Sequence, residues 1–130
     1  MALRIDILKK AEGVIIICAH GSIDSVTYTE LEQQLIPLLV ASTKVLLLNM
    51  ENVKYISSMG ISVILKSKKT IEERGGSFLM TNLQPQIKMT LEILKNLPNM
   101  RVFEDMREAD RYLAEIQRKE IQKQKGDIED

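Results

Sequence analysis

Two short apolar runs constrain the fold of this chain more than any other feature. Val14–Cys18 and Val45–Leu48 are continuously apolar, and the first is rich in β-branched residues. Strands of this kind are covered by protein on both faces, which is typical of sheets with helices packed around them. Both runs are far shorter than the ~18 apolar residues that span a bilayer. They therefore predict buried strands and no membrane insertion.

Amphipathic patterns alternate with the predicted strands. Shorter strands are predicted at Leu3–Ile7, Ser77–Thr81 and Arg101–Phe103, and loops at His20–Ser25 and Val53–Ser58. Four stretches carry apolar residues at helical spacing: Leu31, Leu35, Leu38 and Leu39; Ile61, Ile64, Leu65 and Ile71; Ile87, Leu91 and Leu94; and Met106, Ala109, Leu113 and Ile116. The order β-β-α-β-α-β-α-(β)-α predicts one α/β domain with about four helices and a mixed, mostly parallel sheet of about four to five strands.

Local signals refine the ends of the predicted helices. Thr27 and Glu30 have the spacing of a capping box at the start of the first helix. Pro37 removes one backbone hydrogen bond, so we expect it to kink that helix or end it early. Gly75-Gly76 ends the second helix, and Leu97-Pro98 ends the third.

The C-terminal segment is polar. After Ile116 the apolar stripe thins, and Gln117–Lys125 is almost wholly polar. We expect a domain over residues 1–116, followed over 117–130 by a helical extension that frays at its end. This extension is either a solvated helix end or a docking element for a partner or a second copy of the chain.

The composition excludes several classes of protein. The 130 residues include 18 Lys+Arg and 18 Asp+Glu, and the formal net charge is zero, which argues against a nucleic-acid partner. One cysteine excludes an internal disulfide and a Cys-rich zinc site. Charged residues precede any apolar stretch long enough for a signal peptide, so we expect a cytoplasmic protein.

The chain lacks the motifs of an enzyme. His20 is the single histidine, no Gly-x-Ser-x-Gly motif accompanies it, and Gly75-Gly76 lacks the Lys-Ser/Thr of a phosphate-binding loop. No residues have metal-ligand spacing. We predict that His20 is a structural residue at the end of a strand whose ring nitrogens have hydrogen-bond partners. We also predict that Cys18 is an unreactive thiol in an apolar strand. We therefore predict no catalytic residue, no metal and no cofactor.

A serine pair stands where a predicted helix begins. Tyr55–Ile61 reads Tyr-Ile-Ser-Ser-Met-Gly-Ile and follows the second apolar strand. A serine at this position either caps the helix or accepts a phosphate, because a helix start tolerates added negative charge. From these residues alone, the cap is the favoured reading.

Two segments together resemble the STAS domain family, named for sulphate transporters and anti-sigma factor antagonists. His20–Asp24 matches the family's Gly-x-Leu/Ile-Asp turn after its second strand. Val45–Leu65 matches its buried strand, short loop, Asp/Ser-Ser-x-Gly-hydrophobic motif and helix. The resemblance extends over about residues 3–115, and it implies a small α/β domain.

The resemblance also implies a mechanism. Stand-alone bacterial members bind an anti-sigma factor with serine kinase activity, lose this binding when the kinase phosphorylates one serine, and regain it through a serine phosphatase. By position the acceptor is Ser58, with Ser57 as the second choice in place of the family's frequent Asp. The implied partner-binding residues are Gly21, Ile23, Asp24, Ser57, Ser58, Met59, Gly60 and Ile61, of which Ile61 is the exposed apolar contact.

Two further expectations complete this hypothesis. The Gly21–Asp24 turn and the Ser57–Ile61 segment follow parallel neighbouring strands, so they should meet at one edge of the sheet. We expect a monomer or a weak dimer. The alternative function is a STAS-type scaffold subunit of a larger signalling or transport assembly, without a phospho-switch. Nothing in the sequence marks a pocket for a small molecule.

Overall fold

One five-stranded sheet organises the computed structural model, which describes residues 3–93, 101–115 and 118. The strands lie in chain order and are β1 (Arg4–Ala11), β2 (Val14–Ile23), β3 (Val45–Ile56), β4 (Ser77–Thr81) and β5 (Arg101–Phe103). β1 runs antiparallel to β2, and every other neighbouring pair is parallel. The predicted mixed, mostly parallel sheet is confirmed.

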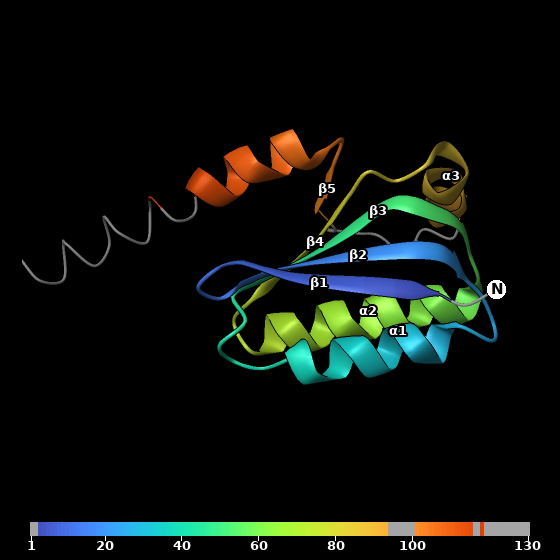
Figure 1. Cartoon of the computed structure of the whole chain (residues 1–130), viewed down its shortest axis with the longest axis horizontal. Coiled ribbons are helices and arrows are strands. Elements are labelled where there is room, and N and C mark those ends of the chain that lie inside the picture. Colours follow the sequence, from blue (N-terminus) through green and yellow to red (C-terminus); the bar gives the residue numbers. More distant parts are fainter. Residues whose placement is uncertain (1–2, 94–100, 116–117, 119–130) are drawn as a thin grey trace, which may run out of the picture.

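Helices connect the parallel strands, as predicted. They are α1 (Tyr28–Leu35), α2 (Ser58–Glu73) and α3 (Pro85–Ile93), and a further, C-terminal helix over residues 106–115 follows β5. In Figure 1, α1 and α2 lie side by side on one side of the sheet, and the C-terminal helix lies on the other. None of these described helices is long and apolar enough to cross a membrane. Leu94, Leu97-Pro98, Ile116 and, apart from Arg118, the segment Gln117–Lys125 lie outside the described residues.

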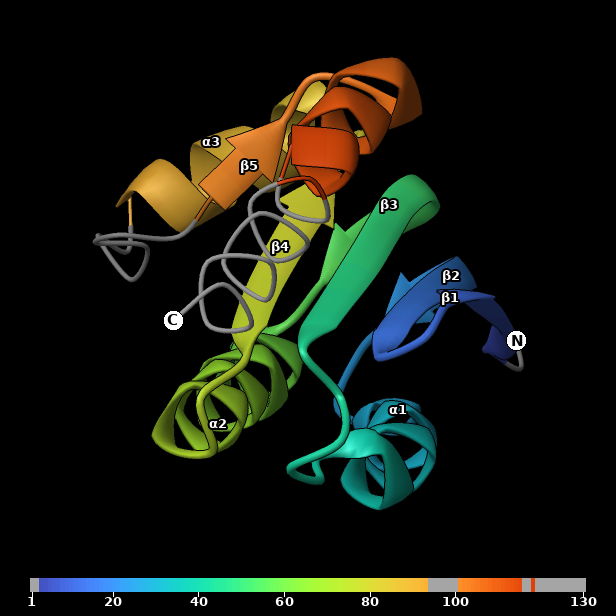
Figure 2. The same cartoon turned by 90° about the vertical axis from the view of Figure 1, so that its left-hand side faces the viewer.

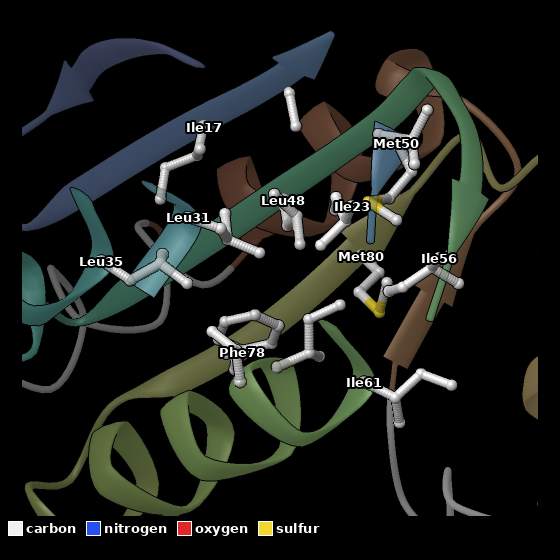
Figure 3. Close-up of a cluster of buried hydrophobic side chains, with 14 of the residues drawn as sticks. Ile17, Ile23, Leu31, Leu35, Leu48, Met50, Ile56, Ile61, Phe78 and Met80 are labelled. Atoms are coloured by element: carbon white, nitrogen blue, oxygen red, sulfur yellow. The ribbon is translucent and has the colours of Figure 1, made fainter. Parts of the chain in front are cut away.

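The two faces of the sheet explain the continuously apolar strands. Successive strand residues point to opposite faces, so a strand covered on both faces has no polar position. One face packs on α1 and α2, and its buried residues include Ile17, Leu48, Phe78 and Met80, drawn in Figure 3. The other face packs on the C-terminal helix, with Ile16, Val45, Leu47 and Leu79 against Ala109 and Leu113. Figure 2 shows the sheet between these layers.

The first helix begins differently from the prediction but ends as predicted. The Thr27 side chain makes no cap to α1, so the predicted capping box is wrong. Its hydroxyl instead donates to the Ser22 carbonyl at 2.6 Å, which ties the helix start to the end of β2. The helix ends at Leu35 and passes into a 3₁₀ turn, Ile36–Leu38, that contains Pro37. The predicted early end at Pro37 is confirmed.

β2 and β3 run further than their apolar runs. Both predicted loops are strand in part, because β2 continues to Ile23 and β3 continues to Ile56. The pairing shifts register twice over this stretch, between Cys18 and His20 and between Gly21 and Ser22, because β3 holds extra residues there. Buried residues recur at every third position of this bulged part of β3 (Met50, Val53 and Ile56), so the extension lacks the two-residue alternation of a regular strand. It carries the ends of β2 and β3 to the start of α2.

Candidate functional site

The turn after β2 and the start of α2 lie against each other. The Ser57 backbone N–H donates to the Ile23 carbonyl at 2.8 Å, directly before α2 begins. Ile23 and Ile56 are the last residues of the neighbouring strands β2 and β3, and both point into the core in Figure 3. The predicted meeting of the Gly21–Asp24 turn and the Ser57–Ile61 segment is confirmed.

Gly60 sits where no side chain fits. A Cβ atom on Gly60 would lie 2.6 Å from Cγ2 of Ile23 and 2.9 Å from Cγ1 of Ile56. Real Cβ atoms do not approach other carbons this closely, so the first turn of α2 packs on the strand ends through a bare backbone. Gly21 has a different reason to be glycine, because its φ of 122° belongs to the region that side chains avoid.

The two serines have separate structural roles. Ser57 is the N-cap of α2, and its side-chain oxygen accepts a hydrogen bond from the Gly60 N–H at 3.3 Å. Ser58 is the first helical residue and is exposed, and its hydroxyl has no partner among the described residues. Two neighbouring residues therefore take the two roles: Ser57 caps the helix, and Ser58 is the candidate phosphate acceptor. The sequence alone left these roles as alternatives for a single serine.

Ile61 is not the exposed apolar residue that we expected. Only 3% of its surface is exposed, and it packs in the core beneath the sheet (Figure 3). The physical reason is that Ile61 starts the same helical stripe as Ile64 and Ile71, and this stripe faces the sheet. Met59 lies two residues earlier, about 200° around the helix, and 43% of its surface is exposed.

Other candidate residues divide in the same way. Ile23 and Gly60 are also buried, so they shape the site and offer no side chain to a partner. Ser58 and Met59 are exposed, and Gly21, Asp24 and Ser57 are partly exposed. Tyr55 was missed by the motif, although it precedes the serines and is 55% exposed. An aromatic residue next to a polar loop was the signal that could have pointed to it.

Asp24 holds the turn beside the serines. Its carboxylate accepts the backbone N–H of Thr27 at 2.9 Å and that of Val26 at 2.8 Å. These hydrogen bonds, the one from Thr27 first, lower the pKa of the Asp24 carboxyl below its ordinary value. Asp24 thus accepts the Thr27 N–H, the donor that the capping box would have paired with the Glu30 side chain.

His20 and Cys18 have structural surroundings. Nε2 of His20 lies 3.0 Å from an Asp6 carboxylate oxygen, and Nδ1 lies 3.0 Å from the Asn52 amide nitrogen. The ring thus joins β1, β2 and β3. Burial raises the pKa of the Cys18 thiol, with Asp6 and Glu51 adding to the shift. Within residues 3–93, 101–115 and 118, no three His, Cys, Asp or Glu side chains are grouped to hold a metal ion.

The fold is that of a known domain. Residues 7–109 match the model of the STAS domain family, and the chain belongs to this family. It is 27% identical over 86 residues to BtrV of Bordetella bronchiseptica, a proposed anti-sigma factor antagonist, and the match covers 66% of this chain and 74% of BtrV.

Solved structures share the fold. The unphosphorylated form of the anti-sigma factor antagonist SpoIIAA matches with a TM-score of 0.69 and 12% identity over 85% of this chain and 98% of SpoIIAA. SpoIIAA, a cell fate determinant of Bacillus, is also known in a phosphorylated form, with a TM-score of 0.66 and 14% identity over 84% of this chain and 99% of that one. The murine anion transporter Slc26a9 matches with a TM-score of 0.68 and 18% identity over 80% of this chain but 18% of the transporter.

The close contact at Gly60 predicts the sign of a stability change. Glycine to alanine at an open helix position stabilises a protein by up to about 1 kcal/mol. Here the added Cβ must displace Ile23 or Ile56, so Gly60→Ala should lower the free energy of unfolding by about 1–3 kcal/mol. Urea unfolding measures the change, and Ser62→Ala, at an exposed position of the same helix, is the control. A more stable Gly60→Ala protein would contradict the contact.

The hydrogen bonds of Asp24 predict a pH dependence. Because its pKa is lower in the folded protein, the carboxylate stabilises the fold above its unfolded pKa, near 3.8, and this contribution is lost as the pH falls through the folded value. Asp24→Asn should therefore be less stable than the wild type at pH 7, with a gap that narrows in acid. Urea unfolding between pH 7 and pH 3 tests this, with Glu30→Gln as control. A gap independent of pH would exclude the carboxylate as its source.

Proposed function

We propose that this protein is an anti-sigma factor antagonist that works by partner switching. In its unphosphorylated form it binds an anti-sigma factor with serine kinase activity, phosphorylation of Ser58 releases that partner, and a serine phosphatase restores binding. It acts in the cytoplasm as a binding module and not as an enzyme. The observation that carries this proposal is the position of Ser58, exposed at the start of α2 and without a hydrogen-bond partner among the described residues.

Ser58 suits a reversible modification because the fold does not use it. The Ser58 hydroxyl makes no hydrogen bond to the described residues, and the cap of α2 is made by Ser57. A phosphate on Ser58 therefore breaks no hydrogen bond within the described part of the chain. The first N–H groups of a helix lack acceptors and carry partial positive charge, and the first turn of α2 contains no acidic residue. The helix start therefore accommodates a phosphate without a change of fold.

The surroundings of Ser58 suit an apolar contact that a phosphate would abolish. Met59 follows Ser58, Tyr55 lies three residues before it, and both are large exposed apolar side chains. Val26 is exposed in the neighbouring turn that Asp24 holds. Phosphorylation adds a charge of about −1.5 to −2 among these side chains. Desolvating that charge in an apolar interface opposes binding, so no movement within this protein is needed for release.

The comparisons support this proposal over the scaffold function. BtrV and SpoIIAA are both named as anti-sigma factor antagonists, and SpoIIAA has a phosphorylated form. The match to Slc26a9 supports the alternative, in which the domain serves a larger assembly and Ser58 is not modified. This chain has Ser57 where the family frequently has Asp. Whether a kinase still recognises Ser58 is therefore the step that distinguishes the partner switch from the scaffold function.

Substitution of Ser58 tests the switch. Ser58→Ala should change the free energy of unfolding by less than about 0.5 kcal/mol, because Ser58 is exposed and has no hydrogen-bond partner in the described part of the chain. It should bind the anti-sigma partner like the wild type and incorporate no phosphate. Ser58→Asp should weaken binding by about 1–3 kcal/mol through desolvation of the carboxylate. Titration calorimetry and mass spectrometry after incubation with kinase and ATP measure both effects.

Two controls separate the switch from general effects of charge and capping. Ser42→Asp adds the same charge at an exposed serine at the other end of the sheet, and it should bind like the wild type. Ser57→Ala should lose about 0.5–2 kcal/mol of stability as a lost cap, yet still be phosphorylated at Ser58. Phosphate found on Ser57 alone, or equal affinity of wild type and Ser58→Asp, would leave the scaffold function as the better account.

Met59 is expected to anchor the partner. Met59→Ala removes an exposed side chain next to Ser58, so it should weaken partner binding by about 1 kcal/mol or more and leave stability nearly unchanged. Ile36→Ala, at an exposed apolar residue of the 3₁₀ turn far from the serines, is the matched control. Titration calorimetry compares the two. Equal losses for both variants would remove Met59 from the interface.

A further inference from the structure

The outer edge of β1 presents apolar side chains on both faces of the sheet. Among the described residues β1 pairs only with β2, so its other edge carries unpaired backbone groups. Ile7 and Leu8 are 45% and 59% exposed in the middle of this strand. Ile7 lies opposite Ile17, on the face of α1 and α2, and Leu8 lies opposite Ile16, on the face of the C-terminal helix.

An edge of this kind pairs with another strand unless charge or shape prevents it. Lys9 and Lys10 are the charges that would protect β1. Both already have partners, since Lys9 lies 3.6 Å from Glu12 and Lys10 lies 2.9 Å from Asp110 on the C-terminal helix. Both pairs are solvent-exposed, so they balance these two charges in part and leave them able to face a partner strand.

We infer that β1 pairs antiparallel with β1 of a second copy of this chain, about a two-fold axis. The contact joins the two sheets into one continuous sheet. It buries Leu8 against its own copy on one face and brings Ile7 of each copy over the Lys9 stem on the other. The pattern of side chains along the strand, and not exposure alone, selects this partner.

Symmetry and charge together select one register. In an antiparallel pair, two opposite residues either both point their N–H and C=O groups toward the other strand or both point them away. Two copies of one strand meet this condition only when the two-fold axis passes through a residue that lies opposite itself. Four positions of the axis place Leu8 opposite a residue of β1. An axis through Asp6 places two carboxylates opposite each other, and an axis through Lys9 places two ammonium groups opposite each other. An axis through Ile7 places Arg4 opposite Lys10. Like charges directly opposite are destabilising, so these three registers are disfavoured. Only an axis through Leu8 places Asp6 opposite Lys10.

The length of the strand limits the strength of this pairing. The register of β1 against β2 shifts between Lys9 and Ala11, and this bulge ends the regular edge. The dimer is therefore short and reversible. The antiparallel axis also turns the Ser58 ends of the two copies to opposite ends of the joined sheet, so dimerisation leaves both ends open. The inference does not depend on phosphorylation of Ser58.

Sedimentation velocity over micromolar to millimolar concentrations tests the interface. The wild type should shift from monomer to dimer as concentration rises, and Leu8→Lys should remain a monomer with an unchanged fold. Met89→Lys is the control, because Met89 is 60% exposed on α3, away from β1 in Figure 2. A wild type that remains monomeric at every concentration, or a Leu8→Lys protein that dimerises like it, overturns the proposal.

Disulfide trapping tests the register in a Cys18→Ser background. Opposite residues of an antiparallel pair have Cα atoms about 4.5–5.5 Å apart, within the range that a disulfide bridges. Leu8→Cys should therefore form a covalent dimer under mild oxidation, visible on a non-reducing gel. Ile7→Cys, whose copies are offset by two residues in this register, should not. A crosslink through Ile7→Cys but not Leu8→Cys would overturn the register.

Discussion

The contact between Ile23 and the bare backbone of Gly60 is the constraint on which the site depends. The methyl group of Ile23 occupies the place where a side chain on Gly60 would be, and the Ile23 carbonyl accepts the Ser57 N–H at 2.8 Å. The first turn of α2 is thus joined to the end of β2 by packing and by a hydrogen bond. Every exposed residue of the proposed surface takes its position from this buried junction.

This junction separates what holds the helix from what a partner meets. Ser57, Gly60 and Ile61 face inward as cap, contact and core. Ser58 and Met59 face solvent from the same helical turn. A charge added to Ser58 therefore changes the surface without disturbing the interior. In the proposed function, the free and phosphorylated forms therefore share one fold.

The sequence predicted most of the fold because apolar periodicity reports burial. Ser77–Thr81 and Arg101–Phe103 were predicted with the observed bounds, and Pro37 ends the first helix because its chemistry is local. The apolar pattern did not predict that β3 continues to Ile56. In that stretch the pairing with β2 contains bulges, and polar residues interrupt the buried ones. Thr27 likewise donates to a carbonyl of the preceding strand, a contact that capping-box spacing cannot show.

The sequence predicted that the two segments meet, but it did not predict which way Ile61 points. The meeting of the two segments followed from parallel neighbouring strands, whereas the inward direction of Ile61 required weighing its motif against its helical stripe. The stripe was the stronger signal because it reflects burial in this chain. The requirement for glycine at position 60 could not be predicted from the sequence. It arises from close packing against Ile23, which is distant in the sequence and becomes a neighbour only in the folded sheet.

The order of the strands has a consequence for how the chain folds. Because the sheet runs from β1 to β5 in chain order, each strand joins an edge formed by the segment just before it. Each pairing then closes a single connection and never spans the whole chain, which makes the contact order lower than in a sheet whose neighbouring strands are not consecutive. During synthesis the sheet can grow one strand at a time as the chain emerges, N-terminal hairpin first.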